Sequence, residues 1–144
     1  PRVHGYAWGK HLVGDRTTGT IAHMDSLLTT ELDGTGIRRL RTAPGMTNEH
    51  RRLPIDRIEL LMETGVGTAT GQGSDPQMML RFSPDGGQTW GAERLAGMGR
   101  QGQTRRRVYW SRFGSPMDPV FQVSVTDPVP SRIIDAWINN AEAA

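Results

Sequence analysis

The chain has 144 residues, with 17 basic and 15 acidic side chains, a formal net charge of +2 and no cysteine. This length allows one domain with a hydrophobic core, or one domain plus the edge of another, and argues against two complete domains. The lack of cysteine excludes disulfides, thiolate metal sites and cysteine nucleophiles. The chain begins at Pro1 without an initiator Met and has no apolar run of signal or membrane type, so we expect a piece of a longer soluble protein whose missing part lies upstream.

Every basic residue except Lys10 is an arginine. Such a bias is typical of genome composition, but the planar guanidinium also suits interfaces with carboxylates and phosphates, so an assembly surface stays open as an interpretation. The 18 Gly and nine Pro are spaced along the chain, which predicts many turns between short strands. The predicted fold class is all-β.

The first part of the chain has weak β patterns separated by turns. The expected elements are a strand over 3–13, a loop over 14–19, a strand over 20–24, a turn-rich connection over 25–36 and a loosely alternating strand over 37–42. The strand–loop–strand layout predicts a hairpin of the kind that a propeller blade presents at its edge. Residues 1–54 are therefore predicted to be the edge or remnant of an upstream, propeller-like β domain.

Alternation is clearer in the second part. Ile58, Leu60 and Met62 share one face of a predicted half-buried strand. Further strands are expected over 77–83, 104–113, 121–126 and 132–138. For the last segment periodicity alone fits a strand or a helical turn, both imperfectly, and we prefer the strand. In the strand over 104–113, alternation places Val108 and Trp110 opposite Phe113. Residues 55–138 are predicted to form a self-contained antiparallel β-sandwich of about six strands, followed by a frayed tail over 139–144.

Residues 83–90, SPDGGQTW, match the Asp-box pattern S-x-D-x-G-x-T-W at every fixed position. The fixed positions are Ser83, Asp85, Gly87, Thr89 and Trp90. The aspartate is expected to accept backbone N–H bonds across a turn, the glycine to supply a positive φ, and the tryptophan to fold its ring under the loop. The motif thus predicts a β-hairpin with a structural role.

Other patterns do not support a catalytic, cofactor or metal site. Gly97, Gly99 and Gly102 match the dinucleotide fingerprint, but a β segment follows them instead of the helix that phosphate binding needs, so we expect a loop. The histidines, His4, His11, His23 and His50, lack metal-site spacing. No carboxylates are paired at the spacing of a glycosidase, and no nucleophile elbow is present. We therefore expect no catalytic residue, no cofactor and no metal.

Basic and aromatic residues are interleaved over residues 100–112. The candidate residues for an interface or for contact with DNA are Arg100, Arg105, Arg106, Arg107 and Arg112. Single-strand nucleic-acid platforms have this composition. A solvated or interface face is the simpler interpretation, in which strand alternation sends Arg106 to one side and Arg105 and Arg107 to the other, with one side pairing with carboxylates.

Five segments together resemble the C-terminal region of packaged-DNA stabilisation proteins of tailed phages and prophages. They are residues 37–44, 62–67, 70–77, 79–83 running into the Asp-box, and 127–129. The resemblance covers most of residues 8–138. Its most specific part is the block METGVG…TGQGSDPQ joined to the Asp-box.

The resemblance implies a structural protein of the virion tail, a subunit of the hub or nozzle ring below the portal and its adaptor in a short-tailed particle. It implies a homo-oligomeric, hexameric ring that contacts portal or adaptor proteins and tail spike or fibre proteins. The ring is expected to retain the packaged genome and later let double-stranded DNA pass without specific binding. Members of this family are structural, so no enzymatic activity and no small-molecule substrate are expected. Assembly in the host cytoplasm is implied.

Two other functions stay open. The Asp-box is best known from sialidases and other β-propellers, so a carbohydrate-binding or sialidase-like propeller fragment is the alternative. Against it, only one copy of the motif is visible and the arginine cluster and Tyr–Glu pair of sialic-acid chemistry cannot be assigned. A single-strand nucleic-acid-binding module is the third interpretation and depends on residues 100–112 alone.

Overall fold

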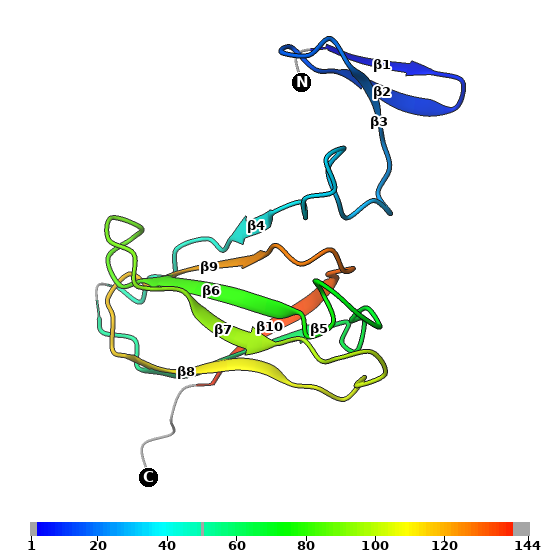
Figure 1. Cartoon of the computed structure of the whole chain (residues 1–144). Coiled ribbons are helices and arrows are strands. Elements are labelled where there is room, and N and C mark those ends of the chain that lie inside the picture. Colours follow the sequence, from blue (N-terminus) through cyan, green and yellow to red (C-terminus); the bar gives the residue numbers. More distant parts are fainter. Residues whose placement is uncertain (1–2, 50, 140–144) are drawn as a thin grey trace. The chain divides into compact units, whose positions relative to one another are not determined.

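The computed structural model describes residues 3–49 and 51–139, which belong to two compact units, Pro1–Ile37 (unit 1) and Arg38–Ala144 (unit 2). Figure 1 shows the strands in the colours of the sequence. Among the described residues, no helix is long and apolar enough to cross a membrane. The predicted frayed tail lies outside the described residues, except for Asn139, at which the last strand ends.

Unit 1 is a three-stranded antiparallel sheet in the order β1-β2-β3. Its strands are β1 Val3–Ala7, β2 Lys10–Gly14 and β3 Ile21–Met24. The prediction of a single strand over 3–13 is wrong, because the chain reverses at Trp8 and Gly9. Both have positive φ (51° and 72°), as a two-residue type I′ hairpin turn requires. The predicted hairpin formed by the last two of these strands is confirmed.

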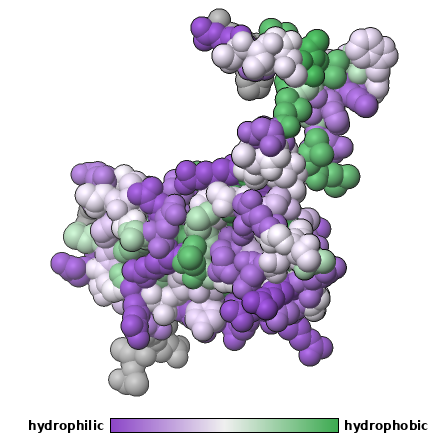
Figure 2. Space-filling model, in the orientation of Figure 1, coloured by the Kyte–Doolittle hydropathy of each residue, from purple (hydrophilic) through white to green (hydrophobic). Residues whose placement is uncertain are grey.

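Apolar side chains of unit 1 are exposed on both faces of its sheet. Cross-strand register places Val3 and Ile21 on one face and Tyr6 and Met24 on the other. All four are exposed, by 60% to 72%, and none of residues 3–37 is buried. Figure 2 shows hydrophobic side chains on the surface of this unit.

Unit 2 is an antiparallel β-sandwich, which confirms the predicted fold class. One sheet has the strand order β10-β5-β8 and the other β4-β9-β6-β7. The strands are β4 Arg39–Thr42, β5 Ile55–Met62, β6 Gln77–Ser83, β7 Arg94–Gly97, β8 Val108–Gly114, β9 Val120–Val125 and β10 Ile133–Asn139. The sequence did not predict β7, because its four residues, RLAG, are too few to show an alternating pattern.

The sandwich unit begins at Arg38, whereas the sequence suggested a start at residue 55. Strand β4 pairs with β9, with Arg39 opposite Val125 and Thr42 opposite Gln122. It is an edge strand whose residues are mostly exposed, so the sequence carries no buried alternation that would have assigned it to this sheet.

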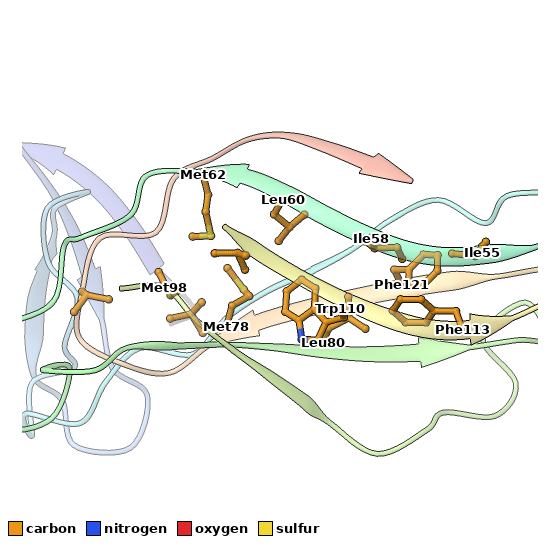
Figure 3. Close-up of a cluster of buried hydrophobic side chains, with 13 residues drawn as sticks. Ile55, Ile58, Leu60, Met62, Met78, Leu80, Met98, Trp110, Phe113 and Phe121 are labelled. Atoms are coloured by element: carbon orange, nitrogen blue, oxygen red, sulfur yellow. The ribbon is translucent and has the colours of Figure 1, made fainter. Parts of the chain in front are cut away.

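The hydrophobic core lies between the inner faces of the two sheets (Figure 3). Strand β5 contributes Ile58, Leu60 and Met62 from the face that alternation predicts, all at most 7% exposed. The other sheet contributes Met78 and Leu80. Three aromatic rings also pack together in unit 2, with their centroids 5.1–5.3 Å apart. They belong to Phe82, Phe113 and Phe121.

Strand β8 departs from the predicted alternation. Val108, Trp110 and Phe113 are all buried, although alternation would have placed Phe113 on the other face. The pairing with β5 shifts between the pairs Ile55–Gly114 and Arg57–Ser111, and Arg112 has a φ of 68°. A β-bulge with a residue in the left-handed region thus inserts one extra residue and turns Phe113 into the core.

Candidate interaction surfaces

Residues 83–90, which match the Asp-box, connect β6 to β7. Oδ1 of Asp85 accepts hydrogen bonds from the Ser83 hydroxyl (2.7 Å) and the Thr89 backbone N–H (2.8 Å), and Oδ2 accepts one from the Thr89 hydroxyl (2.6 Å). The N–H of Gly87 donates to Ser83 Oγ (2.8 Å), and its φ is 95°. The hydrogen bonds from Thr89, followed by that from Ser83, lower the pKa of Asp85 to about 2. The polar groups of the turn therefore satisfy one another and fix its shape.

The turn is also attached to the chain before β9. Gly86 N–H donates to the carbonyl of Asp118 (2.8 Å), and Asp118 N–H donates to the carbonyl of Pro84 (3.3 Å). Trp90 is half-buried, and the guanidinium of Arg81 lies 5.6 Å from its ring centroid. These contacts give residues 83–90 a structural role in joining β6 to β7.

The arginine run at 105–107 precedes β8 and does not lie on it. Residues 104 and 105 are in a turn and the strand begins at Val108, so the predicted strand over 104–113 starts too early. The predicted strand alternation of Arg106 against its two neighbours does not apply, because all three residues lie before β8. All three arginines are exposed.

Arg107 forms a bidentate ion pair with Glu59 on the outer face of the sheet β10-β5-β8. Its Nε donates to Glu59 Oε1 (2.7 Å) and its Nη2 to Oε2 (2.9 Å), while Arg57 Nη2 donates to Oε2 (2.8 Å). The hydrogen bond from Arg107 lowers the pKa of Glu59 against the opposing effect of burial, and the same bond raises the pKa of Arg107. Two guanidinium groups thus compensate one carboxylate that is only 8% exposed.

Aromatic side chains flank this ion pair. Glu59 is opposite Tyr109 on β8 and opposite Trp137 on β10, and the two rings belong to residues 48% and 45% exposed. The guanidinium of Arg57 lies 4.0 Å from the Tyr109 ring centroid. Leu61 on the same strand is also exposed (42%). Arginine, tyrosine and tryptophan are the residues that protein interfaces favour.

The other candidate arginines have different surroundings. Arg105 and Arg106, with Gln103, line a shallow open hollow of about 240 Å³. Arg100 forms an exposed ion pair with Asp75 (3.4 Å), and Arg112 occupies the bulge of β8. The described structure therefore does not gather the five candidates around one pocket.

The glycine pattern at residues 97–102 begins at Gly97, the last residue of β7, and continues into the connection to β8. A Cβ on Gly99 would lie 2.9 Å from the carbonyl oxygen of Gln103, and its φ is 92°. The glycine is therefore required by a close backbone approach. The prediction of a loop between strands is confirmed.

A cleft of about 320 Å³, here called the edge cleft, lies beside β4 and the start of β10. Its lining includes Arg39, Arg41, Val123, Val125, Ser131 and Ile133. Strands β4 and β10 each have one hydrogen-bonded neighbour within the described sheets. This cleft was not predicted from the sequence, because its lining combines residues from four strands, β4, β6, β9 and β10, that are far apart in the chain.

The two arginines of the edge cleft differ. Arg39 donates from Nη1 to the carbonyl of Val129 (2.5 Å) and from Nη2 to that of Asp127 (2.6 Å), and burial lowers its pKa. Its Nε is buried without a hydrogen-bond partner. Arg41 is exposed, and no carboxylate among the described residues pairs with it.

The fold and these surfaces define a β-sandwich with a buried hydrophobic core, an internally bonded turn and arginine-rich outer surfaces. Comparison with known families then gives a more specific result: the family model for the β-sandwich of bacteriophage P22 Gp10 matches residues 38–140. The chain therefore belongs to this family of phage structural proteins. None of the curated proteins compared with the chain matches it.

Proposed function

We propose that this chain is part of a structural tail protein of a short-tailed phage, a subunit of the hub or nozzle ring that attaches below the portal and its adaptor. The observation that carries the proposal is the family match, which begins at residue 38, where unit 2 also begins. The matched family thus corresponds to a complete structural unit of this chain. In the ring, the protein retains the packaged DNA and forms part of the channel through which the DNA leaves.

The physical character of unit 2 supports a mechanical role. Its core is made of aliphatic and aromatic side chains that are at most 7% exposed, and densely packed interiors of this kind resist deformation. The turn at residues 83–90 is closed by its own hydrogen bonds, so it acts as a fold element. A wall that contains pressurised DNA needs this rigidity and needs no catalytic group.

The surfaces of unit 2 supply contacts for a homo-oligomeric, hexameric ring and for portal, adaptor and tail spike or fibre proteins. The outer face with Trp137, Tyr109 and the ion pair of Arg107 has the composition of an interface. Exposed arginines such as Arg105 and Arg106 contact passing double-stranded DNA weakly and without sequence preference, because strong phosphate binding along a channel would slow ejection.

Electron microscopy of the full-length protein, alone and in its particle, tests the proposal. The expected result is a ring around a DNA-sized channel, docked beneath a portal and adaptor. A monomeric propeller with an open concave pocket would contradict it and favour the carbohydrate-binding alternative. Assembly occurs in the host cytoplasm. Because the protein is a subunit of the virion tail, it should be found in purified virions by mass spectrometry.

A further inference from the structure

The connection that follows β3 is both acidic and apolar. Residues 25–34, here called the acidic loop, contain no basic residue, three acidic residues and three leucines: Asp25, Glu31, Asp33, Leu27, Leu28 and Leu32. The three leucines are 85%, 48% and 75% exposed. Three exposed leucines within one short loop group apolar surface in one segment, and grouped apolar surface of this kind indicates a contact site.

The tip of the acidic loop has a fixed shape. Glu31 N–H donates to the carbonyl of Thr35 (2.8 Å), and Gly34 N–H donates to the carbonyl of Glu31 (3.0 Å). The carboxylate of Asp33 accepts from the hydroxyl (2.6 Å) and the N–H (2.9 Å) of Thr35, which lowers the pKa of Asp33 and keeps it charged. The tip therefore presents Leu32 between two carboxylates, and little ordering entropy is lost when it binds.

The edge cleft has the complementary character. Its apolar lining includes Ile133, which is 37% exposed, and the partly buried Val123, and its charged lining residues are Arg39 and Arg41. Arg39 already donates to two carbonyls, whereas Arg41 has no carboxylate partner among the described residues. A ligand with one apolar side chain and an adjacent carboxylate would satisfy both features.

We propose that the acidic loop of one copy of this chain binds in the edge cleft of another copy, with Leu32 on the apolar lining and a neighbouring carboxylate paired with Arg41. Because the two surfaces differ, the contact is heterologous, and repetition of such a contact closes a ring when the rotation permits. Every copy carries both halves. DNA would satisfy Arg41 but would leave the leucines and the apolar lining exposed to water. The inference rests on the proposed function, because a ring requires a repeated head-to-tail contact.

Cysteine cross-linking of the full chain tests this contact directly, because the natural sequence has no cysteine. One protein carries Leu32→Cys and a second carries Ser131→Cys, in the lining of the cleft. The two are mixed with a short bismaleimide, and linked dimers are measured on a denaturing gel. A control pairs Leu32→Cys with Glu63→Cys, an exposed position outside the cleft. We expect the first pair to link at least about tenfold faster, because docking holds the two thiols at a high effective concentration.

Charge reversal makes the test specific for Arg41. Arg41→Glu in the cleft-bearing protein should slow cross-linking about tenfold, because like charges across an interface repel. Combining it with Glu31→Arg in the loop-bearing protein should restore the rate, because this change leaves the bonds between Asp33 and Thr35 in place. Arg51→Glu, at an exposed position outside the cleft lining, should leave the rate unchanged.

Equal linking at positions 131 and 63, or an unchanged rate in Arg41→Glu, would overturn the inference. So would a chain carrying both cysteines that links to itself at a rate independent of concentration. If microscopy shows the ring in the particle but the thiols at 32 and 131 do not link, the inference fails while the proposed function stands. If the protein is absent from virions, the proposed function fails, and the cross-linking result still decides the contact between copies.

Discussion

Replacement of Trp110 by phenylalanine should weaken the sandwich at a defined point. Trp110 is 5% exposed, and its Nε1 donates to the carbonyl of Arg94 (2.9 Å), so its side chain joins β8 to β7. Phenylalanine leaves a void of about 40 Å³, which costs about 1 kcal/mol at ~24 cal/mol per Å³. The lost apolar burial adds about 1 kcal/mol, and the unpaired carbonyl adds about 1 kcal/mol. Trp110→Phe should therefore lower the free energy of unfolding by about 3 kcal/mol.

Trp137→Phe is the matched control, because the same atoms are removed from a side chain on the outer face that is 45% exposed. Its expected effect is within about 0.5 kcal/mol. Both variants can be compared with the natural chain by urea unfolding, followed by far-ultraviolet circular dichroism at a low protein concentration. A lower midpoint with an unchanged slope would report a loss of stability. Equal losses in the two variants would refute the argument that burial and the hydrogen bond to Arg94 set the cost.

Three further predictions concern the turns. The hydrogen bonds of its turn hold the pKa of Asp85 at about 2. The contribution of its charged carboxylate to the free energy of unfolding is fully present above pH 3.8 and is lost as the pH falls through about 2. Asp85→Asn should therefore flatten the acid side of the stability profile measured by circular dichroism. Trp90→Ala should cost about 2 kcal/mol in calorimetry, less than a fully buried tryptophan would, because the ring is half-buried. Gly65→Ala and Gly71→Ala both place alanine at positive φ, but only at Gly65 would the new Cβ lie 2.9 Å from the backbone of Gln103. In thermal unfolding, Gly71→Ala should cost about 1 kcal/mol and Gly65→Ala clearly more.

The fold was predictable from the sequence where one face of a strand is buried along its whole length. The pattern of Ile58, Leu60 and Met62 identified β5 and its inner face, because a two-residue period has one structural explanation there. Phe113 was placed on the wrong face because the bulge at Arg112 breaks that period. A bulge of this kind depends on pairing with another strand, and a local pattern does not contain that information.

In the candidate sites, contacts between residues near one another in the sequence were predictable, and contacts between distant residues were not. The bonds of Asp85 within its turn were predictable, because donors and acceptor lie within four residues of one another. Arg107 was recognised as an interface candidate, but its partner Glu59 was not, since the two are 48 positions apart. Only the register of β5 against β8 brings them together, and that register is set by the whole sheet.

Unit 1 lacks the interactions that normally keep a sheet folded. It has three strands, and none of residues 3–37 is buried, although sheets of this size need a covered hydrophobic face for independent stability. Val3 and Ile21 require cover on one face, and Tyr6 and Met24 require it on the other. A sheet that is apolar on both sides is suited to a position between two other layers. The sequence shows no buried stripe in unit 1, because its apolar side chains are divided between the two faces of the sheet.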